Sequence, residues 1–522
     1  GAGGLRDYHT MRWIGRIKYD LCELRDLEYH GVLSSREYEN LFDALSFIWR
    51  VRNRLHYFTG RKCDQLYFDH QERLADEMGL VEEDGQLPVE RLMSELHAKM
   101  GYVKQQLLLL LFELGFEKPA RRGFGVRRQP DIPGIEVSRG GLGFHSSNRI
   151  VKSPILLIRI FEAAARLRMP LTREAGRLVR EFGYLVDDDF RANPDVRRAF
   201  ENILLIPAGP VNVLELMLET GFLVRMIPEF GGIVDRIQFD AYHLHPVDRH
   251  SLRTIHFIKS FADNPPEGVD PLCIKIYNGL KRKHLLLLAA LLHDIGKGRA
   301  DGKHSATGAQ MAPTIMARLG YGSRESEVVS FLIENHLLLV KTASRRDIND
   351  EETAIRIARE VGQVNLLKML YLLTVADSMA TGPKAWNNWT ATLVRDFFLK
   401  ILGILEKGEL ATSGAVRQVE KKKAYVRKAA DFPGLDVEAM LEVLSPRYLL
   451  YTQARDIVSH IQLYRQLADQ PFVWEIVPEE ASNTRSVVVC AKDRPGLFSK
   501  ISGVFTLNGM DVLDAQIYTW RN

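Results

Sequence analysis

The stretch that decides the fold of this chain runs from Leu285 to Gly298 and reads LLLLAALLHDIGKG. Its apolar part, LLLLAALL, carries no polar side chain, which indicates a helix that is buried on all sides. The run ends in adjacent His293 and Asp294, and burying an imidazole and a carboxylate is costly unless both are paired or bind a cation. Gly296 and Gly298 follow at once and are typical of a loop after a helix end. Taken alone, the pair has a simpler interpretation as a satisfied His–Asp contact in the core.

The composition is that of an ordinary globular protein. The 522 residues are 46% hydrophobic and 26% charged, and this length predicts roughly three or four domains. A net charge of +4 is small for this size and gives no argument for nucleic acid. The four cysteines lack CxxC spacing, which argues against a disulfide framework and a thiolate zinc site. Because no apolar run is long enough to span a bilayer and no signal peptide is recognisable, we expect a cytoplasmic protein that binds neither nucleic acid nor membrane.

Helical periodicity dominates the chain, and the predicted fold class is mainly α. Apolar residues recur at spacings of three and four through most of the sequence, whereas residues 121–144, rich in Arg, Gly and Pro, predict a loop or short strands. Near residue 485 the period changes, because Ser486–Cys490 and Asp511–Tyr518 are β-like and flank a helical Leu497–Leu507. This β-α-β order predicts a small α+β domain. The predicted parts are a helical domain (1–135), a helical connecting region (136–240), an all-α domain (241–400), a helical linker (401–480) and the small α+β domain (481–522).

Polar residues of metal-ligand type close several of the predicted apolar helices. His293 and Asp294 end one, His336 ends the run VVSFLIENH, and Asp377 follows the apolar part of LLTVADSMAT. Packed helices can point such residues at one place, as the metal sites of helix bundles do. His304, in the loop-to-helix segment GRADGKHSATGAQM, is a further candidate.

One more candidate ligand precedes the apolar helix. His250 would lie in the first turn of a helix capped by Asp248. His243, His245 and His256 lie close by, but the cap and the VDRHSL context favour His250.

A set of His and carboxylate ligands without Cys suits a borderline or hard divalent ion. Mn or Mg fits best, with Fe or Zn as alternatives. Two such ions, or one ion with an open position, would polarise a phosphate oxygen and activate water near neutral pH. Lys297 would then neutralise charge on the phosphoryl group, although a solvated lysine explains this residue equally well.

The order H…HD…H…H…D resembles the HD superfamily of metal-dependent phosphohydrolases. The resemblance implies that the first His, the HD pair and the last Asp bind one metal, and that further histidines bind a second metal in some members. Carried over to this chain, the first set is His250, His293, Asp294 and Asp377, and the second is His304 and His336. We expect His293, Asp294 and Lys297 to take part in catalysis.

Further motifs narrow the resemblance. GAGGLRDYHTMRW, HLHPVDRHSLR, HDIGKGRADGKHSATGA, ADSMATGPKAWNNW and DRPGLFSKI with NGMDVLDAQIYT occur in this order. Together they resemble the bifunctional PII uridylyltransferase/uridylyl-removing enzymes of bacterial nitrogen regulation, over essentially the whole chain. The resemblance implies that the HD domain hydrolyses UMP from a tyrosine of the PII signal protein, and that ACT domains sense glutamine.

The same resemblance makes the chain look incomplete. The Gly-Ser and Asp-x-Asp residues that would hold Mg for nucleotidyl transfer are not recognisable, and the sequence begins without Met. We therefore expect a fragment without the nucleotidyltransferase core, which keeps the helical segment that follows that core. In that segment the basic cluster Arg50, Arg52, Arg54 and Arg61 has two interpretations, as contacts to nucleotide phosphates or as a solvated or carboxylate-paired surface.

A candidate effector loop lies near the C-terminus. The residues DRPGL follow a predicted strand and open a helix, so free backbone amides at the helix start can receive a carboxylate. Pro495 and Gly496 suit that geometry. The resemblance to ACT domains implies glutamine binding by this loop, which comprises Asp493, Arg494, Pro495, Gly496 and Leu497, in a first ACT domain that is truncated here.

Three other functions remain as alternatives. A ppGpp hydrolase also combines HD and ACT domains, but its characteristic synthetase region is not recognisable. Hydrolysis of cyclic di-GMP by an HD-GYP domain is disfavoured because no GYP motif follows the HD pair. A non-enzymatic amino-acid sensor and PII-binding scaffold with an inactive HD site is the third.

Overall fold

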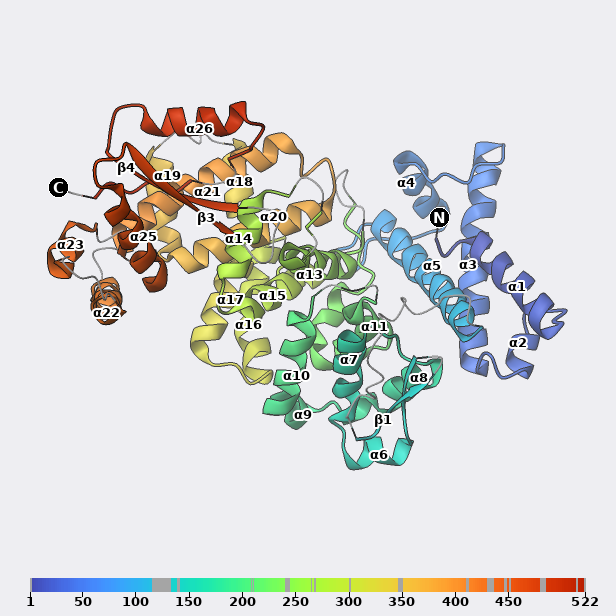
Figure 1. Ribbon diagram of the computed structural model, residues 1–522. Coiled ribbons are helices and arrows are strands. Elements are labelled where there is room, and N and C mark those ends of the chain that lie inside the picture. Colours follow the sequence, from blue (N-terminus) through green and yellow to red (C-terminus); the bar gives the residue numbers. More distant parts are fainter. Residues whose placement is uncertain are drawn as a thin grey trace. The chain divides into compact units, whose positions relative to one another are not determined.

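The computed structural model (Figure 1) describes residues 2–114, 133–138, 141–207, 209, 211–239, 245–263, 265–266, 269–299, 302–345, 351–409, 413–429, 436–445, 448–449, 452–478, 485–512 and 515–520. These residues are mainly helical, with two small antiparallel sheets. The predicted fold class, mainly α with a small α+β part near the C-terminus, is therefore confirmed. Among the described helices, none combines the length and the apolar character needed to cross a membrane.

The chain folds into two compact units that interleave along the sequence. The first comprises residues 1–262, 280–338 and 372–391, and the second comprises residues 263–279, 339–371 and 392–522. All six predicted metal ligands belong to the first unit.

The first unit begins with helices that pack on one another around a common apolar core. They are α1 (Leu5–Tyr19), α2 (Asp26–Tyr29), α3 (Ser35–Thr59), α4 (Phe68–Glu77) and α5 (Pro88–Glu113). The long helices α3 and α5 lie side by side (Figure 1), with Leu41 and Val103 fully buried in the shared core. A capping box of Ser34 and Glu37 starts α3, which satisfies two amides at the helix start.

A short hairpin and a group of helices follow. The elements are β1 (Ile135–Ser138), β2 (Gly141–Phe144), α6 (Ser147–Lys152), α7 (Leu156–Leu167), α8 (Arg173–Glu181), η1 (Phe182–Leu185), α9 (Asp188–Ala192), α10 (Pro194–Leu205), α11 (Val213–Glu219), α12 (Phe222–Met226) and η2 (Pro228–Ile233). The strands pair antiparallel from Ile135 opposite Phe144 to Ser138 opposite Gly141. The short strands predicted within residues 121–144 are thus present, while residues 121–132 lie outside the described part.

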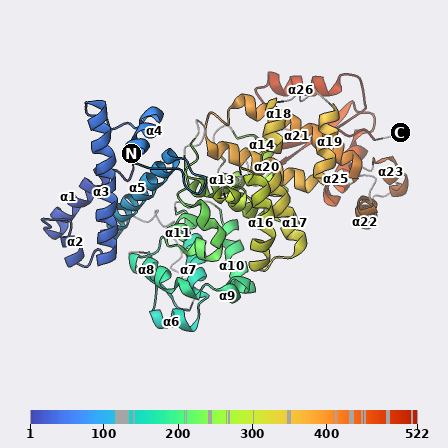
Figure 2. The ribbon, with the colours of Figure 1, turned by 180° about the vertical axis from the view of Figure 1, so that it is seen from behind.

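The helices that carry the candidate metal ligands complete the first unit. They are α13 (Val247–Asp263), α15 (Lys283–Leu292), η3 (Ile295–Gly298), α16 (His304–Arg318), α17 (Ser323–Asn335) and the second part of α20 (Val364–Thr381). Every residue from Leu285 to Leu292 is buried, as the opening stretch predicts. Helices α16 and α17 lie side by side (Figure 2).

Gly296 brings η3 close to the start of α16. A Cβ at this position would come within 2.0 Å of the His304 carbonyl oxygen. Only glycine allows this approach, which is the structural reason for the first glycine of DIGKG.

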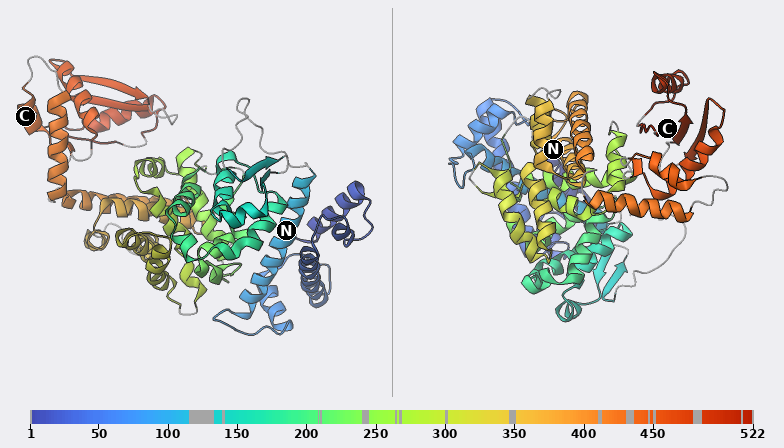
Figure 3. Two further views of the ribbon diagram at one scale, coloured as in Figure 1. Left: turned by 90° about the horizontal axis from the view of Figure 1, so that it is seen from below. Right: turned by 90° about the vertical axis from the view of Figure 1, so that its left-hand side faces the viewer.

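The second unit contains the remaining elements, wholly or for the most part. They are α14 (Pro271–Gly279), α18 (Leu338–Arg345), α19 (Glu351–Val361), α21 (Asn388–Glu409), α22 (Ser413–Ala429), α23 (Val437–Val443), α25 (Ala454–Leu467), β3 (Phe472–Pro478), β4 (Arg485–Ala491) and α26 (Leu497–Leu507). Strands β3 and β4 form an antiparallel ladder from Phe472 opposite Ala491 to Pro478 opposite Arg485, drawn as orange-red arrows in Figure 3.

The C-terminal part differs from the prediction in detail. The predicted strand 486–490 and helix 497–507 are present as β4 and α26, but residues 511–512 and 515–520 form no strand in the structure. Tyr518 and Trp520 pack instead against a helical core cluster that includes Val426 and Tyr448. The partner of β4 is β3, which lies in the region predicted as a helical linker.

Candidate metal centre

Three of the six candidate ligands lie directly after an apolar helix. His293 is the C-cap of α15, Asp294 is the N-cap of η3, and His336 is the C-cap of α17. His304 is the first residue of α16. His250 and Asp377 lie within α13 and α20. The structure therefore brings all six predicted ligands to neighbouring positions, from residues 250 to 377 of the sequence.

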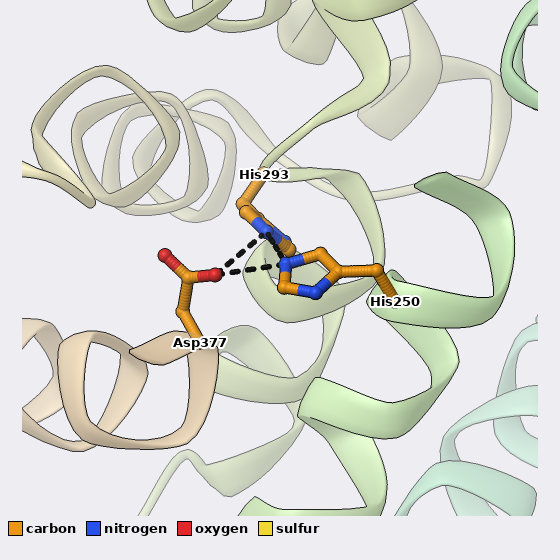
Figure 4. A group of neighbouring side chains, drawn as sticks. All are labelled: His250, His293 and Asp377. Atoms are coloured by element: carbon orange, nitrogen blue, oxygen red, sulfur yellow. Dashed lines mark hydrogen bonds and ion pairs between the residues drawn. The ribbon is translucent and has the colours of Figure 1, made fainter. Parts of the chain in front are cut away.

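His250, His293 and Asp377 form the first group (Figure 4). The Nε2 atom of His250 lies 2.8 Å from Asp377 Oδ1 and 3.3 Å from Nε2 of His293. The Nε2 atom of His293 lies 3.5 Å from the same oxygen of Asp377. Three atoms of metal-ligand type thus converge at one point, and all three residues are buried.

Asp294, His304 and His336 form the second group. The Oδ1 atom of Asp294 lies 3.8 Å from His304 Nε2 and 3.9 Å from His336 Nε2. The other carboxylate oxygen, Oδ2, lies 3.3 Å from His293 Nε2. Asp294 therefore presents one oxygen to each group and lies between them.

Backbone carbonyls orient two of the histidines. The Nδ1–H of His293 donates to the carbonyl of Ala290 over 2.9 Å, and the Nδ1–H of His336 donates to the carbonyl of Ile333 over 2.7 Å. This leaves the Nε2 atom of each ring as the one that faces the carboxylates. Such a hydrogen bond on the outer nitrogen is the usual support of a metal-binding His.

Thr374 supports His336 from another helix. Its hydroxyl donates to the carbonyl of His336 over 3.1 Å and is buried. Sequence reasoning missed this residue, although its position one turn before Asp377 on an apolar helix was an available signal.

The charges of the centre favour a cation. Burial opposes the charged form of Asp294 and Asp377, but Lys297 and His293 beside the first, and His293 and His250 beside the second, hold the pKa of both carboxyls well below the ordinary value. Burial would also lower the pKa of His293, but the two carboxylates raise it to about 10. A buried place that keeps two carboxylates ionised and draws a proton onto a histidine is one where a metal ion can take the place of that proton.

The residues present fit a divalent ion by a second criterion. Asp294 Oδ1 is buried and accepts no hydrogen bond. A buried carboxylate oxygen without a partner is costly, and a metal ion held with His304 and His336 would satisfy it.

Two residues make contacts that were not predicted from the sequence. Lys297 donates to Asp294 Oδ2 over 2.7 Å, so it holds a candidate ligand instead of standing free. Asp248 does not cap α13, which begins one residue earlier. Its buried carboxylate accepts the amide of Asp235 over 3.1 Å instead, because the chain before the helix folds back onto this residue.

The neighbouring histidines lie outside both groups. His245 and His256 belong to neither set of converging ligand atoms among the described residues, and His243 lies outside the described part of the chain. The choice of His250 therefore agrees with the geometry.

The other predicted sites are present as local structure. Asp493, Arg494, Pro495 and Gly496 form an exposed loop between β4 and α26, and Leu497 begins the helix. In the basic cluster of α3, Arg52 pairs with Asp64 over 2.7 Å, and Arg54 donates to the carbonyl of Glu77 over 2.6 Å. These contacts favour the carboxylate-paired interpretation for Arg52.

A helical fold that brings His and Asp side chains together in this order is the arrangement of an HD domain. The chain matches the family model described as HD domain over residues 247–379. That class implies a divalent metal at the centre.

Further comparisons extend the likeness beyond the HD domain. Residues 1–111 match the model described as GlnD PII-uridylyltransferase, and residues 136–226 match the one described as Uridylyltransferase GlnD third domain. Proteins named bifunctional uridylyltransferase/uridylyl-removing enzyme, from Azospirillum brasilense and Ruegeria pomeroyi, are 32% and 33% identical over the whole of this chain. The chain spans 57% and 58% of their lengths. The chain thus carries domains of the GlnD uridylyltransferase type together with an HD domain, and it is similar to a part of the bifunctional uridylyltransferase/uridylyl-removing enzymes.

Proposed function

We propose that this chain carries the uridylyl-removing activity: metal-dependent hydrolysis of UMP from a tyrosine of the PII signal protein. The observation that carries the proposal is the convergence of six His and Asp side chains, five of them buried, at one place within a single compact unit. The names of the relatives indicate a uridylyl group as the group removed, and the matched model described as GlnD PII-uridylyltransferase indicates the PII protein as its carrier.

The reaction is the hydrolysis of a phosphodiester. Water adds to phosphorus, the bond from phosphorus to the tyrosine oxygen breaks, and UMP and the tyrosine hydroxyl are released. Bound Mn or Mg would supply Lewis-acid stabilisation of the charge on the phosphate oxygens. The ligands that we assign are His250, His293 and Asp377 for one ion and Asp294, His304 and His336 for a second.

The chain's own residues have separate tasks in this proposal. Asp294 is shared by the two ligand groups, and Lys297 fixes its carboxylate through a short hydrogen bond. His304 has 29% of its side chain exposed, whereas the other His and Asp side chains of the centre are at most 10% exposed. We therefore place the approach of the phosphodiester on the side of His304.

The remaining parts of the assignment rest on the family. We propose the domain limits 1–135, 136–240, 241–400, 401–480 and 481–522, of which the first three contain the matched ranges. The loop Asp493–Leu497 is proposed as the glutamine site of an ACT domain, and the cytoplasm as the place of action.

The test combines metal content with release of UMP. The purified chain is loaded with Mn, and UMP is measured after addition of uridylylated PII. We expect UMP release by the unaltered chain and its loss in the double variant His293→Ala with Asp294→Ala. His284→Ala, on the same helix but outside both ligand groups, is the matched control. Undiminished release by the double variant would refute the proposal.

A further inference from the structure

We propose that a cavity beside the HD motif binds the nucleoside part of the substrate, with Arg236 and Arg299 as its principal contacts. This inference rests on the proposed function, since it assigns a place to the uridine of the UMP group. The cavity belongs to the first unit and lies outside the ligand groups described above.

The cavity has the size of a small-molecule site. Its volume is about 510 Å³, within the range of roughly 300–1,000 Å³ that is usual for such sites. Its walls come from three separate parts of the sequence, represented by Asp84 and Ser94, by Gly232 and Arg236, and by Gly298 and Arg299.

The cavity begins one short turn away from the metal centre. Asp294 caps η3 and Gly298 ends it. At a rise of about 2 Å per residue in such a helix, the two positions are about 8 Å apart. A nucleotide whose phosphorus lies at the centre therefore has its sugar and base within reach of this wall.

Two glycines fix this wall. A Cβ on Gly298 would meet the backbone of Gly232 at 3.1–3.2 Å, and a Cβ on Gly232 would meet Gly298 at 3.4 Å. The turns η2 and η3 thus touch through their backbones. Arg236 follows Gly232 in the sequence and Arg299 follows Gly298, so this backbone contact holds both arginines in the lining of the same cavity.

The polar groups of the wall match a nucleoside. Uracil offers carbonyl oxygens, which accept hydrogen bonds from a guanidinium, and ribose hydroxyls can donate to the carboxylate of Asp84. The Ser94 oxygen accepts the amide of Ile237 over 3.0 Å, and its own proton can be donated into the cavity. Val234 is the one lining residue with an apolar side chain among those described, so the wall suits a nucleoside better than an aromatic side chain of the PII protein.

The first measurement is binding of UMP to the full chain loaded with Mn, by calorimetry. We expect Arg236→Ala and Arg299→Ala each to weaken UMP binding about tenfold, the effect of losing one charge-assisted hydrogen bond. Arg324→Ala, an exposed residue in the first turn of α17, is the control and should bind as the unaltered chain does.

The second measurement separates the cavity from the chemistry. The rate constant kcat/KM is compared for uridylylated PII and for bis(4-nitrophenyl) phosphate, a phosphodiester without a nucleoside. The value of kcat/KM for uridylylated PII, divided by that for bis(4-nitrophenyl) phosphate, should fall about tenfold in both arginine variants. If both this ratio and the UMP affinity are unchanged in the arginine variants, the inference is overturned. It is also overturned if these variants bind unmodified PII more weakly while their affinity for UMP is undiminished, because the arginines would then contact the protein. If the unaltered chain hydrolyses neither substrate, the proposed function fails. The UMP affinities of the variants then still test whether the cavity binds the nucleotide.

Discussion

At the scale of single residues, the protonation of His293 links metal binding to pH. The carboxylates of Asp294 and Asp377 raise the pKa of this histidine to about 10 although burial opposes the charge. Without metal it is therefore protonated at neutral pH, and it must lose that proton to become a ligand. We expect the ion bound by His250, His293 and Asp377 to release about one proton per chain, with an apparent affinity that rises about tenfold per pH unit around neutral pH. Calorimetry in buffers of different ionisation enthalpy measures the proton, and binding of metal without proton release would contradict the assignment.

His336 differs from His293 in its protonation. Burial, with the nearby His293, lowers its pKa to about 4, so it is neutral at pH 7 and needs no deprotonation. In His336→Ala we expect the second ligand group to lose its ion while the first keeps one. Elemental analysis should then find one Mn per chain instead of two. The Mn affinity of the second group should fall by more than the roughly 10–100-fold that follows loss of a residue hydrogen-bonded to a ligand. His256→Ala is the control, and equal metal content in both variants would argue against two groups.

At the scale of elements, an ion pair ties α3 to α8. The Glu37 carboxylate accepts from Arg177 Nε over 3.3 Å and Nη2 over 2.5 Å. Burial would raise the pKa of Glu37, but the hydrogen bond and charge of Arg177 lower it to about 2 from an ordinary 4.5. The folded state thus holds the proton more weakly than the unfolded state, so this stabilisation is present above pH 4.5 and is lost as the pH falls toward 2.

The expected size of this effect is about 2 kcal/mol, after allowance for the partial exposure of the arginine. Denaturant unfolding of Glu37→Gln should show the largest deficit near pH 7 and converge with the unaltered chain near pH 2. Glu174→Gln, an exposed neighbour of Arg177 on α8, should show little change at any pH. A deficit that does not depend on pH would mean that the contact acts through packing alone.

Elements were predictable from sequence where their pattern is local. Helix α15 was predictable because an unbroken apolar run followed by glycine fits one structure. Strand β3 was missed because its residues, FVWEIVP, were assigned to a helical linker, and the pairing that defines a strand lies elsewhere in the chain. Residues 511–518 show the converse: their pattern is strand-like, but residues 511–512 and 515–518 form no strand, because no described segment pairs with them.

At the scale of the whole molecule, the sequence predicted which residues lie at the metal centre but not how they are distributed between the two ligand groups. The six ligand types were recognisable from their order, whereas the shared position of Asp294 depends on side-chain directions at two adjacent helix ends, which spacing does not determine. The interleaving of the two units was likewise outside prediction, because residues 263–279 and 339–371 leave the first unit and the chain returns to it each time. Long-range packing decides both features.

The same arrangement predicts where metal stabilises the molecule. An ion bound by His250, His293 and Asp377 links α13, the end of α15 and α20, and at 100 times its dissociation constant it stabilises them by about 2.7 kcal/mol. Amide hydrogen exchange measures this stabilisation helix by helix. We expect Mn to slow exchange up to about 100-fold in these helices and to leave β4 and α26 unchanged. The effect should vanish in His293→Ala, and equal protection of α26 would show that the metal acts outside the proposed centre.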